Sequence, residues 1–378
     1  MEDVAENGGR IGYQARQRSQ IALGLTAFRN DDILIAKITP CFENEKGWLA
    51  NGLEAGVGFG STELHVIRCG KEILPRFVYA HTLLPQFRLR GKRYMTGSAG
   101  QQRVPASFLN DYVIWVPDLQ LQSAICRVDV AYERSLLTFD RLIAAKREQK
   151  RGLMQQLLTG KLRFPGFTEP WAALTIKSLL ASDCSGAWGE EPNESNSGTV
   201  ILRSTNITND GRIDLQSTVY RILDHKKRND LLIHAGDILL ERSGGTDTRP
   251  VGRVAFARMD LGACFSNFLQ RLRPNEEVVD PRFLFWQLFK LHAIGATNRL
   301  QAQTTGIRNL MFRAYLEQPV LIPERREQTR ICDLIQLVSN EIELLEQQRA
   351  AFAAQRRGLM EKLLSGEIDI QNPKETAA

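Results

Sequence analysis

Apolar residues recur at steps of three and four along two long stretches of the chain. The first stripe consists of Ile125, Val128, Tyr132, Leu136, Phe139 and Ile143, and the second of Ile331, Ile335, Val338, Ile342 and Leu345. A narrow apolar stripe with charges between its members predicts a long helix packed along one partner. A single such helix also suits packing on its own domain, but pairing the two helices antiparallel buries both stripes at once.

The ends of both stretches carry helix signals. Pro117 and Pro323 come just before them, and Gly160 and Gly366 follow where a C-terminal cap belongs. The stretches also end alike, because RGLMQQLLTGK begins at Arg151 and RGLMEKLLSGE begins 206 positions later. The sequence therefore predicts two helices with matching ends.

The similarity extends into an internal repeat. At the same offset, Gln122 falls on Gln328 and Pro75-Arg76-Phe77 falls on Pro281-Arg282-Phe283, while NDDILIAK and AGDILLER align after a one-residue slip. Two copies of a module of about 200 residues are thus present.

The segments between the helices have the pattern of short strands and loops. DILIAKI, ELHVIRC, DILLERS, RVAFARM and FLQRLRP favour strands, and Pro75 and Pro281 open two shorter helices. The predicted fold class is α+β, with two mixed α/β heads, each followed by a long helix, and the helices paired as an antiparallel coiled coil. The expected boundaries are 1–115 for the first head, 116–165 for the first helix, 166–321 for the second head and 322–378 for the second helix.

Composition adds few constraints. A length of 378 residues suits two domains, and a net charge of +6 permits an anionic partner without requiring one. The first thirty residues lack a signal-peptide pattern, and no apolar run approaches the roughly 18 residues that span a bilayer, so we expect a cytoplasmic protein without a membrane segment. The six cysteines have no C-x-x-C spacing, which favours reduced thiols.

No motif for catalysis is evident. The chain lacks a G-x-x-x-x-G-K-[ST] phosphate loop, an Asn-Pro-Pro-aromatic or Asp-Pro-Pro-aromatic methyltransferase motif, and a pair of histidines at metal-ligand spacing. We therefore predict no catalytic residue, no metal and no cofactor in this chain, and interpret its histidines as surface or hydrogen-bonded core residues.

The repeated motifs carry a family resemblance. The arrangement [IV]-P-x(4)-Q-x(2)-I-C at 116–126 and 322–332, followed by a long helix ending in RGLMxxLL[TS]G, resembles the specificity subunit of type I restriction-modification systems. The resemblance implies a non-catalytic DNA-recognition subunit, in which each head reads one half of a split target. The helices would set the gap between the two half-sites and dock methyltransferase subunits. By this resemblance there are two such subunits, and they use S-adenosylmethionine. Motor-nuclease subunits would join them.

The first head departs from this family pattern. It lacks an equivalent of about 37 residues that precede GDILLERSGG in the second head. A start codon assigned too late, a truncated silent gene left by recombination, and a short head whose edge another chain covers are three alternatives. An uncovered strand edge favours aggregation, so we expect poor expression of the isolated chain.

Two groups of residues are candidates for binding. Arg and Lys contact phosphates or guanine, and Asn and Gln contact adenine, so basic and amide-rich loops are candidates for DNA contact. In the first head these are Lys37, Arg90, Lys92, Arg93, Gln101, Gln102 and Arg103. In the second head they are Lys226, Lys227, Arg242, Arg249, Asn298, Arg299, Gln301, Gln303, Thr304 and Arg308.

The matching helix ends are candidates for docking two identical partners. They comprise Lys146, Arg147, Lys150, Arg151, Leu153, Met154, Arg356, Arg357, Leu359 and Met360. The alternative is that this motif only closes the helix pair, and both roles are compatible.

Two other classes of function fit parts of the pattern. A two-headed scaffold that binds protein or glycan needs no salt-dependent DNA affinity. A nuclease with a helical arm needs a constellation of carboxylates or metal ligands, which neither module contains.

Overall fold

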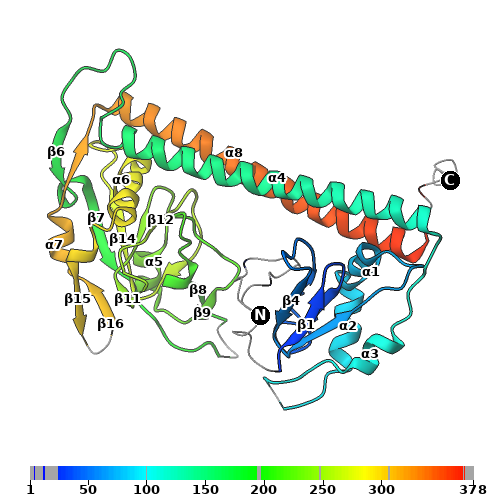
Figure 1. The fold of residues 1–378 in the computed structure, drawn as a ribbon. Coiled ribbons are helices and arrows are strands. Elements are labelled where there is room, and N and C mark those ends of the chain that lie inside the picture. Colours follow the sequence, from blue (N-terminus) through cyan, green and yellow to red (C-terminus); the bar gives the residue numbers. More distant parts are fainter. Residues whose placement is uncertain are drawn as a thin grey trace. The chain divides into compact units, whose positions relative to one another are not determined.

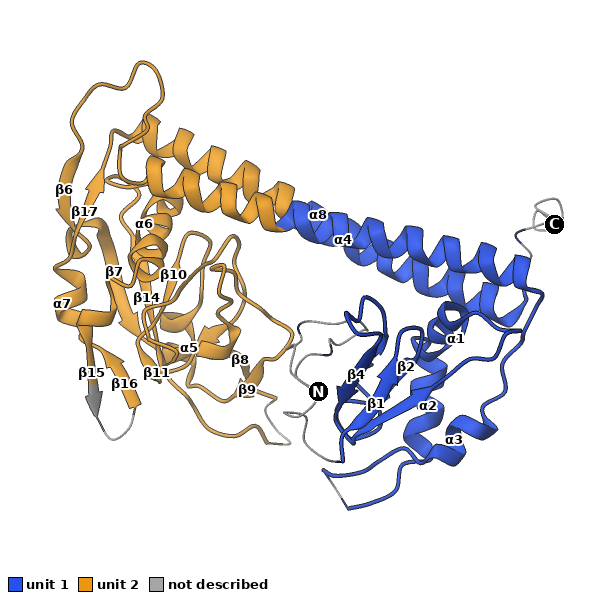
Figure 2. Ribbon diagram, viewed as in Figure 1, with its two compact units in different colours: residues 1–143, 344–378 blue, residues 144–343 orange. Residues whose placement is uncertain are grey.

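A computed structural model describes the chain. It covers Val4, Gly12 and residues 24–98, 100–193, 197–246, 248–304, 307–368 and 370, without the side chains of residues 303 and 304. The chain forms two compact units, one made of residues 1–143 with 344–378 and the other of residues 144–343 (Figure 2). Each unit joins one head to half of each long helix, and the α+β class is confirmed.

The two long helices begin and end where the sequence predicts. Helix α4 (Leu119–Leu157) and helix α8 (Arg325–Ser365) each start two residues after a proline. Gly160 and Gly366 follow them with φ of 70° and 78°, a left-handed conformation that glycine adopts without a steric cost.

The halves of α4 and α8 run antiparallel within each unit (Figure 1). In the first unit an ion pair of 2.6 Å and a ring contact of 4.7 Å between centroids join the helices, and in the second unit an ion pair of 2.8 Å does so. These contacts are Asp140–Arg349, Tyr132–Phe352 and Lys146–Glu341. Because the α8 number falls as the α4 number rises, the predicted antiparallel pairing is confirmed.

Among its described residues, the first head contains two antiparallel sheets and three short helices. Strands β3 (Gly47–Leu49), β2 (Ile33–Ala36) and β5 (Leu64–Ile67) form one sheet in the order β3-β2-β5, and β1 (Thr26–Arg29) pairs with β4 (Val57–Gly60). The helices are α1 (Pro75–Thr82), α2 (Pro85–Arg93) and α3 (Ala106–Asp111). Ile33, Ile35, Phe42 and Phe87 form the centre of its core.

The second head is built around a larger sheet. Strands β12 (Val254–Phe256), β10 (Ile238–Glu241), β14 (Leu269–Pro274) and β7 (Leu180–Ser185) lie in that order and are all antiparallel. Helix α6 (Pro281–Ala293) contacts β12 and β14. In the first head the counterpart of β14 is β5, and only β2 pairs with it among the strands that the structure describes.

The smaller elements of the second head form three further sheets. Their orders are β13 (Cys264–Phe265)-β8 (Thr199–Leu202)-β9 (Val219–Arg221), β17 (Pro319–Ile322)-β6 (Ala172–Thr175), and β11 (Ser243–Gly245)-β16 (Ile307–Leu310)-β15 (Gln301–Thr304). Helices α5 (His225–Leu231) and α7 (Phe312–Leu316) and the 3₁₀ turns Lys177–Leu179, Ser204–Asn206 and Asn298–Leu300 complete it.

A buried aspartate is repeated at the start of the central strand of each head. Asp32 accepts two hydrogen bonds from Arg68, at 2.7 and 2.6 Å, and Asp237 accepts two from Arg273, at 2.7 and 2.8 Å. Both aspartates are 1% exposed. The repeat therefore preserves the ion pair that joins strands β2 and β5, and β10 and β14.

A buried glutamine near the start of each long helix clasps the head to the helix. Gln122 accepts from the backbone N–H of Leu74 at 2.8 Å and donates to the carbonyl of Pro117 at 2.7 Å. Gln328 makes the matching bonds to the N–H of Asp280 at 2.7 Å and to the carbonyl of Pro323 at 2.8 Å. This pair, which we call the glutamine clasp, explains why the glutamine recurs in both motifs.

The six cysteines are free thiols. Within the described residues no helix is both long enough and apolar enough to cross a membrane. No cluster of three or more potential metal ligands occurs among them either.

Candidate nucleic-acid interface

The same backbone arrangement occurs in both heads where the central strand ends. After β10, the N–H of Arg242 donates to the carbonyl of Phe268 at 2.9 Å, and the N–H of Leu310 donates to the carbonyl of Arg242 at 2.8 Å. After β2, Lys37 makes the same two bonds with Glu63 and Val104, at 2.9 and 2.8 Å. We call this arrangement the strand corner, defined by Lys37, Glu63, His65 and Arg103 in the first head and by Arg242, Phe268, Gln270 and Asn309 in the second.

The corner of the second head brings together two segments that the sequence suggested separately. Strand β11 pairs with β16, and β16 pairs with β15, so the loop that begins at Arg242 lies beside the segment 301–310. The candidates Gln301, Gln303, Thr304 and Arg308 are on β15 and β16 rather than in a loop. The side chains of Gln303 and Thr304, and all of Thr305 and Asp247, lie outside the described residues.

Arg242 and Arg249 differ in their surroundings. The half-buried Arg242 donates from Nη1 to Oε1 of Gln270 at 3.1 Å, and its guanidinium lies 5.9 Å from the ring centroid of Phe312. Arg249 has a side chain that is 48% exposed and lies 3.5 Å from the carboxylate of Glu241. Both remain candidates for DNA contact, and Arg242 has the more fixed position.

The remaining candidates of this region are less tightly held. Asn298 and Arg299 are exposed in a 3₁₀ turn, where Arg299 donates to Gln318 at 3.2 Å. The amide of Gln301 donates to the carbonyl of Val251 at 3.3 Å, which ties the start of β15 to the head.

In the first head, Arg103 is held by an internal ion pair. It donates to both carboxylate oxygens of Glu63 at 2.9 Å, and this hydrogen bonding lowers the pKa of Glu63. The neighbouring Gln101 is exposed, whereas the carbonyl of Gln102 accepts from Thr39. Lys37 has no side-chain hydrogen bond to a described residue.

The basic run at 88–93 is a helix and not a loop. Arg90, Lys92 and Arg93 are exposed on α2, as a DNA-contacting surface requires. Arg88, in contrast, is buried and donates to the carbonyls of Thr82 and Phe42, so it is structural. Burial lowers the pKa of Arg88 to about 10.

Residues 168–351 match the family model of the type I restriction modification DNA specificity domain. The match covers the second head and the larger part of α8. Over 118 residues the chain is 44% identical to the type I restriction enzyme EcoAI specificity subunit of Escherichia coli and 42% identical to the EcoEI subunit of the same organism. Each of these matches covers 31% of this chain and 20% of the relative, so the chain spans a fifth of their length.

More distant relatives match over a greater length. The MjaVIII specificity subunit of Methanocaldococcus jannaschii is 22% identical over 298 residues, which cover 73% of this chain and 67% of that one. A solved chain from a type I R-M system covers 97% of this chain and 90% of its own length, with a TM-score of 0.61 and 16% identity. The S subunit from M. genitalium covers 90% and 84%, with a TM-score of 0.52 and 15% identity. These structures support the fold of a specificity subunit.

Lys226 and Lys227 lie outside the strand corner of this specificity domain. They are exposed on α5, which packs against β13, and Asp224 caps that helix by accepting from the N–H of Lys227 at 2.8 Å. Their exposure suits a phosphate contact.

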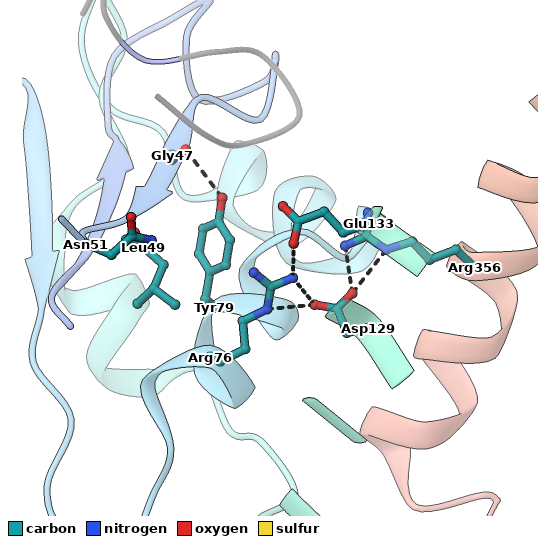
Figure 3. Close-up of polar contacts among 8 residues, drawn as sticks. All are labelled: Gly47, Leu49, Asn51, Arg76, Tyr79, Asp129, Glu133 and Arg356. Atoms are coloured by element: carbon teal, nitrogen blue, oxygen red, sulfur yellow. Dashed lines mark hydrogen bonds and ion pairs between the residues drawn. The ribbon is translucent and has the colours of Figure 1, made fainter. Parts of the chain in front are cut away.

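Several docking candidates make internal contacts instead. Figure 3 shows Arg356 of α8 donating to Asp129 of α4, which also accepts from Arg76 of α1. The distances are 2.6 Å for both bonds, and Asp129 is 1% exposed. Arg356 therefore joins the helix pair to the first head.

The apolar docking candidates are also internal. Met154 and Met360 are buried in cores of their own units, with Leu153 and Leu359 packed against the same cores. Lys146 pairs with Glu341, and Lys150 lies 4.7 Å from the ring centroid of Trp286, where burial lowers its pKa. These apolar residues of the motif thus hold the helices against the heads, whereas Arg147, Arg151 and Arg357 are exposed docking candidates.

Two buried polar groups of the second head were not predicted. Glu241, at the end of β10, accepts two bonds from Arg253, at 2.8 and 2.9 Å, and Arg253 donates to the carbonyls of Ser204 and Ile207. Gln270 joins Asp183 to Arg242. A charged residue inside an otherwise apolar strand, as in DILLER, was the signal for the first group, whereas nothing in the sequence indicated the second.

Proposed function

We propose that this chain is the DNA-recognition subunit of a type I restriction-modification complex. Each head would read one half of a bipartite target, and the chain would contribute no catalytic group. The observation that carries the proposal is the strand corner, because one backbone arrangement is built twice and holds different side chains each time. Two readers of different half-sites need such a combination.

The paired helices supply the second part of the proposal. Helices α4 and α8 would set the gap between the half-sites, and two methyltransferase subunits would dock on them, through exposed residues such as Arg147, Arg151 and Arg357. S-adenosylmethionine would bind to those subunits and not to this chain, and motor-nuclease subunits would complete the complex in the cytoplasm.

The test is co-expression with the cognate methyltransferase subunit, followed by single-molecule sequencing of adenine methylation in host DNA. A split motif with a constant gap is the expected result. Methylation at a single half-motif would mean that one head does not read DNA, and the absence of any motif would favour the scaffold or a silent gene product. Binding of the purified complex to DNA should also weaken steeply with salt.

A further inference from the structure

A chain of three polar side chains crosses the second head and ends at the strand corner. Asp183 of β7 accepts from Nε2 of Gln270 at 2.7 Å, and Oε1 of Gln270 accepts from Nη1 of Arg242 at 3.1 Å. Gln270 lies on β14 and is 3% exposed, so its amide has little room to rotate.

This order of donors and acceptors fixes the orientation of the amide. Reversing it would put the amide N–H groups of Gln270 against the guanidinium of Arg242 and its carbonyl against the carboxylate of Asp183. Both contacts would be repulsive, because guanidinium has only donors and carboxylate has only acceptors. Asp183 therefore keeps the acceptor of Gln270 directed at Arg242.

The same contact determines which edge of Arg242 is available. Its Nη1 is held by Gln270 and its backbone is held by Phe268 and Leu310. In the part of the chain that the structure describes, Nε and Nη2 have no hydrogen-bond partner. These two donors form a planar fork, and a planar fork matches the two acceptors O6 and N7 of guanine.

We propose that Gln270 and Asp183 are positioning residues that present Arg242 to a guanine in the half-site read by the second head. The inference rests on the proposed function and deepens it by naming one base and the residues that select it. A phosphate contact is the competing role for Arg242, but a phosphate contact carries no base preference and needs no fixed edge.

The first head lacks this device. Lys37 stands at the position of Arg242, and His65 stands at the position of Gln270. A ring nitrogen of His65 is 2.8 Å from the carbonyl of Val104, so His65 is engaged with the backbone and not with Lys37. Lysine is a single point donor, which distinguishes bases less strictly than a fork does.

The test uses the full complex with its methyltransferase subunit and a pool of DNA duplexes in which the second half-site is randomised. Four forms of the chain are compared in this complex: the wild type, Arg242→Lys, Gln270→Leu and Asp183→Asn. We expect the wild type to require guanine at one position. Arg242→Lys should reduce that requirement about tenfold or more, since a good bidentate contact contributes about 1–3 kcal/mol of discrimination.

The positioning variants give a graded readout at the same position. Gln270→Leu should reduce the guanine requirement several-fold without changing other positions, and Asp183→Asn should retain it, because the asparagine oxygen still accepts from Gln270. Lys227→Ala serves as control, with binding weakened equally for all sequences. A melting curve for each variant shows whether it is folded.

The outcomes separate the two proposals. If the wild type selects no base in either half-site, the proposed function is wrong. If the wild type selects a motif and Arg242→Lys leaves every position unchanged, the inference alone is wrong. Equal weakening across all sequences in Arg242→Lys would assign Arg242 to a phosphate and would also overturn the inference.

Discussion

In the first head Lys37, Glu63 and Arg103 occupy the strand corner, whereas Arg242, Phe268 and Asn309 occupy it in the second. The two main-chain hydrogen bonds that define the corner have the same lengths to within about 0.1 Å, whereas the side chains differ. In the first head the cation Arg103 is paired with Glu63, and in the second the matching positions hold an aromatic ring and an amide. The two heads thus share a main-chain arrangement and differ in the side chains that it carries, as the proposed reading of two different half-sites requires.

The largest effect is expected where the heads differ most inside the sheet. Glu241, the last residue of β10, lies opposite Arg253, which directly precedes β12, and the two are 1% and 8% exposed. Ala36 lies opposite Lys46 at the matching place of the first head. Glu241→Ala leaves Arg253 buried without a counter-charge, which costs about 3–5 kcal/mol of unfolding free energy. Chemical denaturation of the full chain, monitored by hydrogen exchange in β10, measures this loss of unfolding free energy.

The control for that variant places both residues of the first head, alanine and lysine, at the matching positions of the second head. Glu241→Ala combined with Arg253→Lys should recover part of the loss, because lysine is flexible enough to reach solvent. If Glu241→Ala alone were as stable as the wild type, the ion pair between Glu241 and Arg253 would not stabilise the head.

The next comparison concerns pH. His81 in α1 occupies the place of Gln287 in α6, whose amide donates at 3.0 Å to the carbonyls of Leu158 and Leu321. His81 is 5% exposed, its Nε2 has no hydrogen-bond partner among the residues that the structure describes, and burial lowers its pKa to about 4. The expectation of a hydrogen-bonded core histidine is therefore wrong at this nitrogen.

The sign of the pH effect follows from this depressed pKa. Below about pH 6.5 the unfolded chain binds the proton first, so the stability of the first unit falls from there toward pH 4, by about 2 kcal/mol at pH 5. We expect His81→Gln to reduce this fall, and the reciprocal Gln287→His to enlarge the smaller fall that His292 already causes in the second unit. Thermal melts at pH 7.5 and pH 5 measure both, and identical profiles for His81→Gln and wild type would contradict the assignment. Burial also lowers the pKa values of His65 and His292, which leaves a residual fall in every variant.

A third comparison transfers the arginine and glutamine of the second strand corner to the first head. Lys37→Arg with His65→Gln gives the first head a forked donor and an amide beside it. We expect a several-fold gain in preference for guanine at one position of the first half-site, less than the effect in the second head because no counterpart of Asp183 is present among the described residues. Sequencing of methylated sites measures this preference. A change confined to the second half-site would contradict the correspondence of Lys37 and His65 with Arg242 and Gln270.

The smallest effect is expected at the exposed ion pair. Glu63→Ala should change the melting temperature little, because the side chain of Arg103 is 43% exposed and solvent screens the pair. Freed from Glu63, Arg103 should strengthen DNA binding without sequence preference and steepen its salt dependence. Unchanged affinity at low salt would place Arg103 away from DNA.

The sequence was sufficient for those features that depend on periodicity and on single residues with strong conformational preferences. The stripes, Pro117 and Pro323, and the two cap glycines located both helices to within a few residues, and the repeat located the matching strands. The position of Arg88 was not predictable, because a basic run on a short helix gives no indication of which cation points inward. The contact of Asp183 with Gln270 joins residues 87 positions apart on neighbouring strands, and such pairing depends on sheet order that no local pattern encodes.

The glutamine clasp involves only main-chain groups of the head and of the helix entry, in both copies. Every amino acid except proline supplies the same N–H, and every amino acid supplies the same carbonyl. The contact between head and helix consequently does not depend on which side chains the head carries at these positions. A head with other side chains at these positions therefore forms the same hydrogen bonds with the glutamine, and the helix that carries it needs no adjustment.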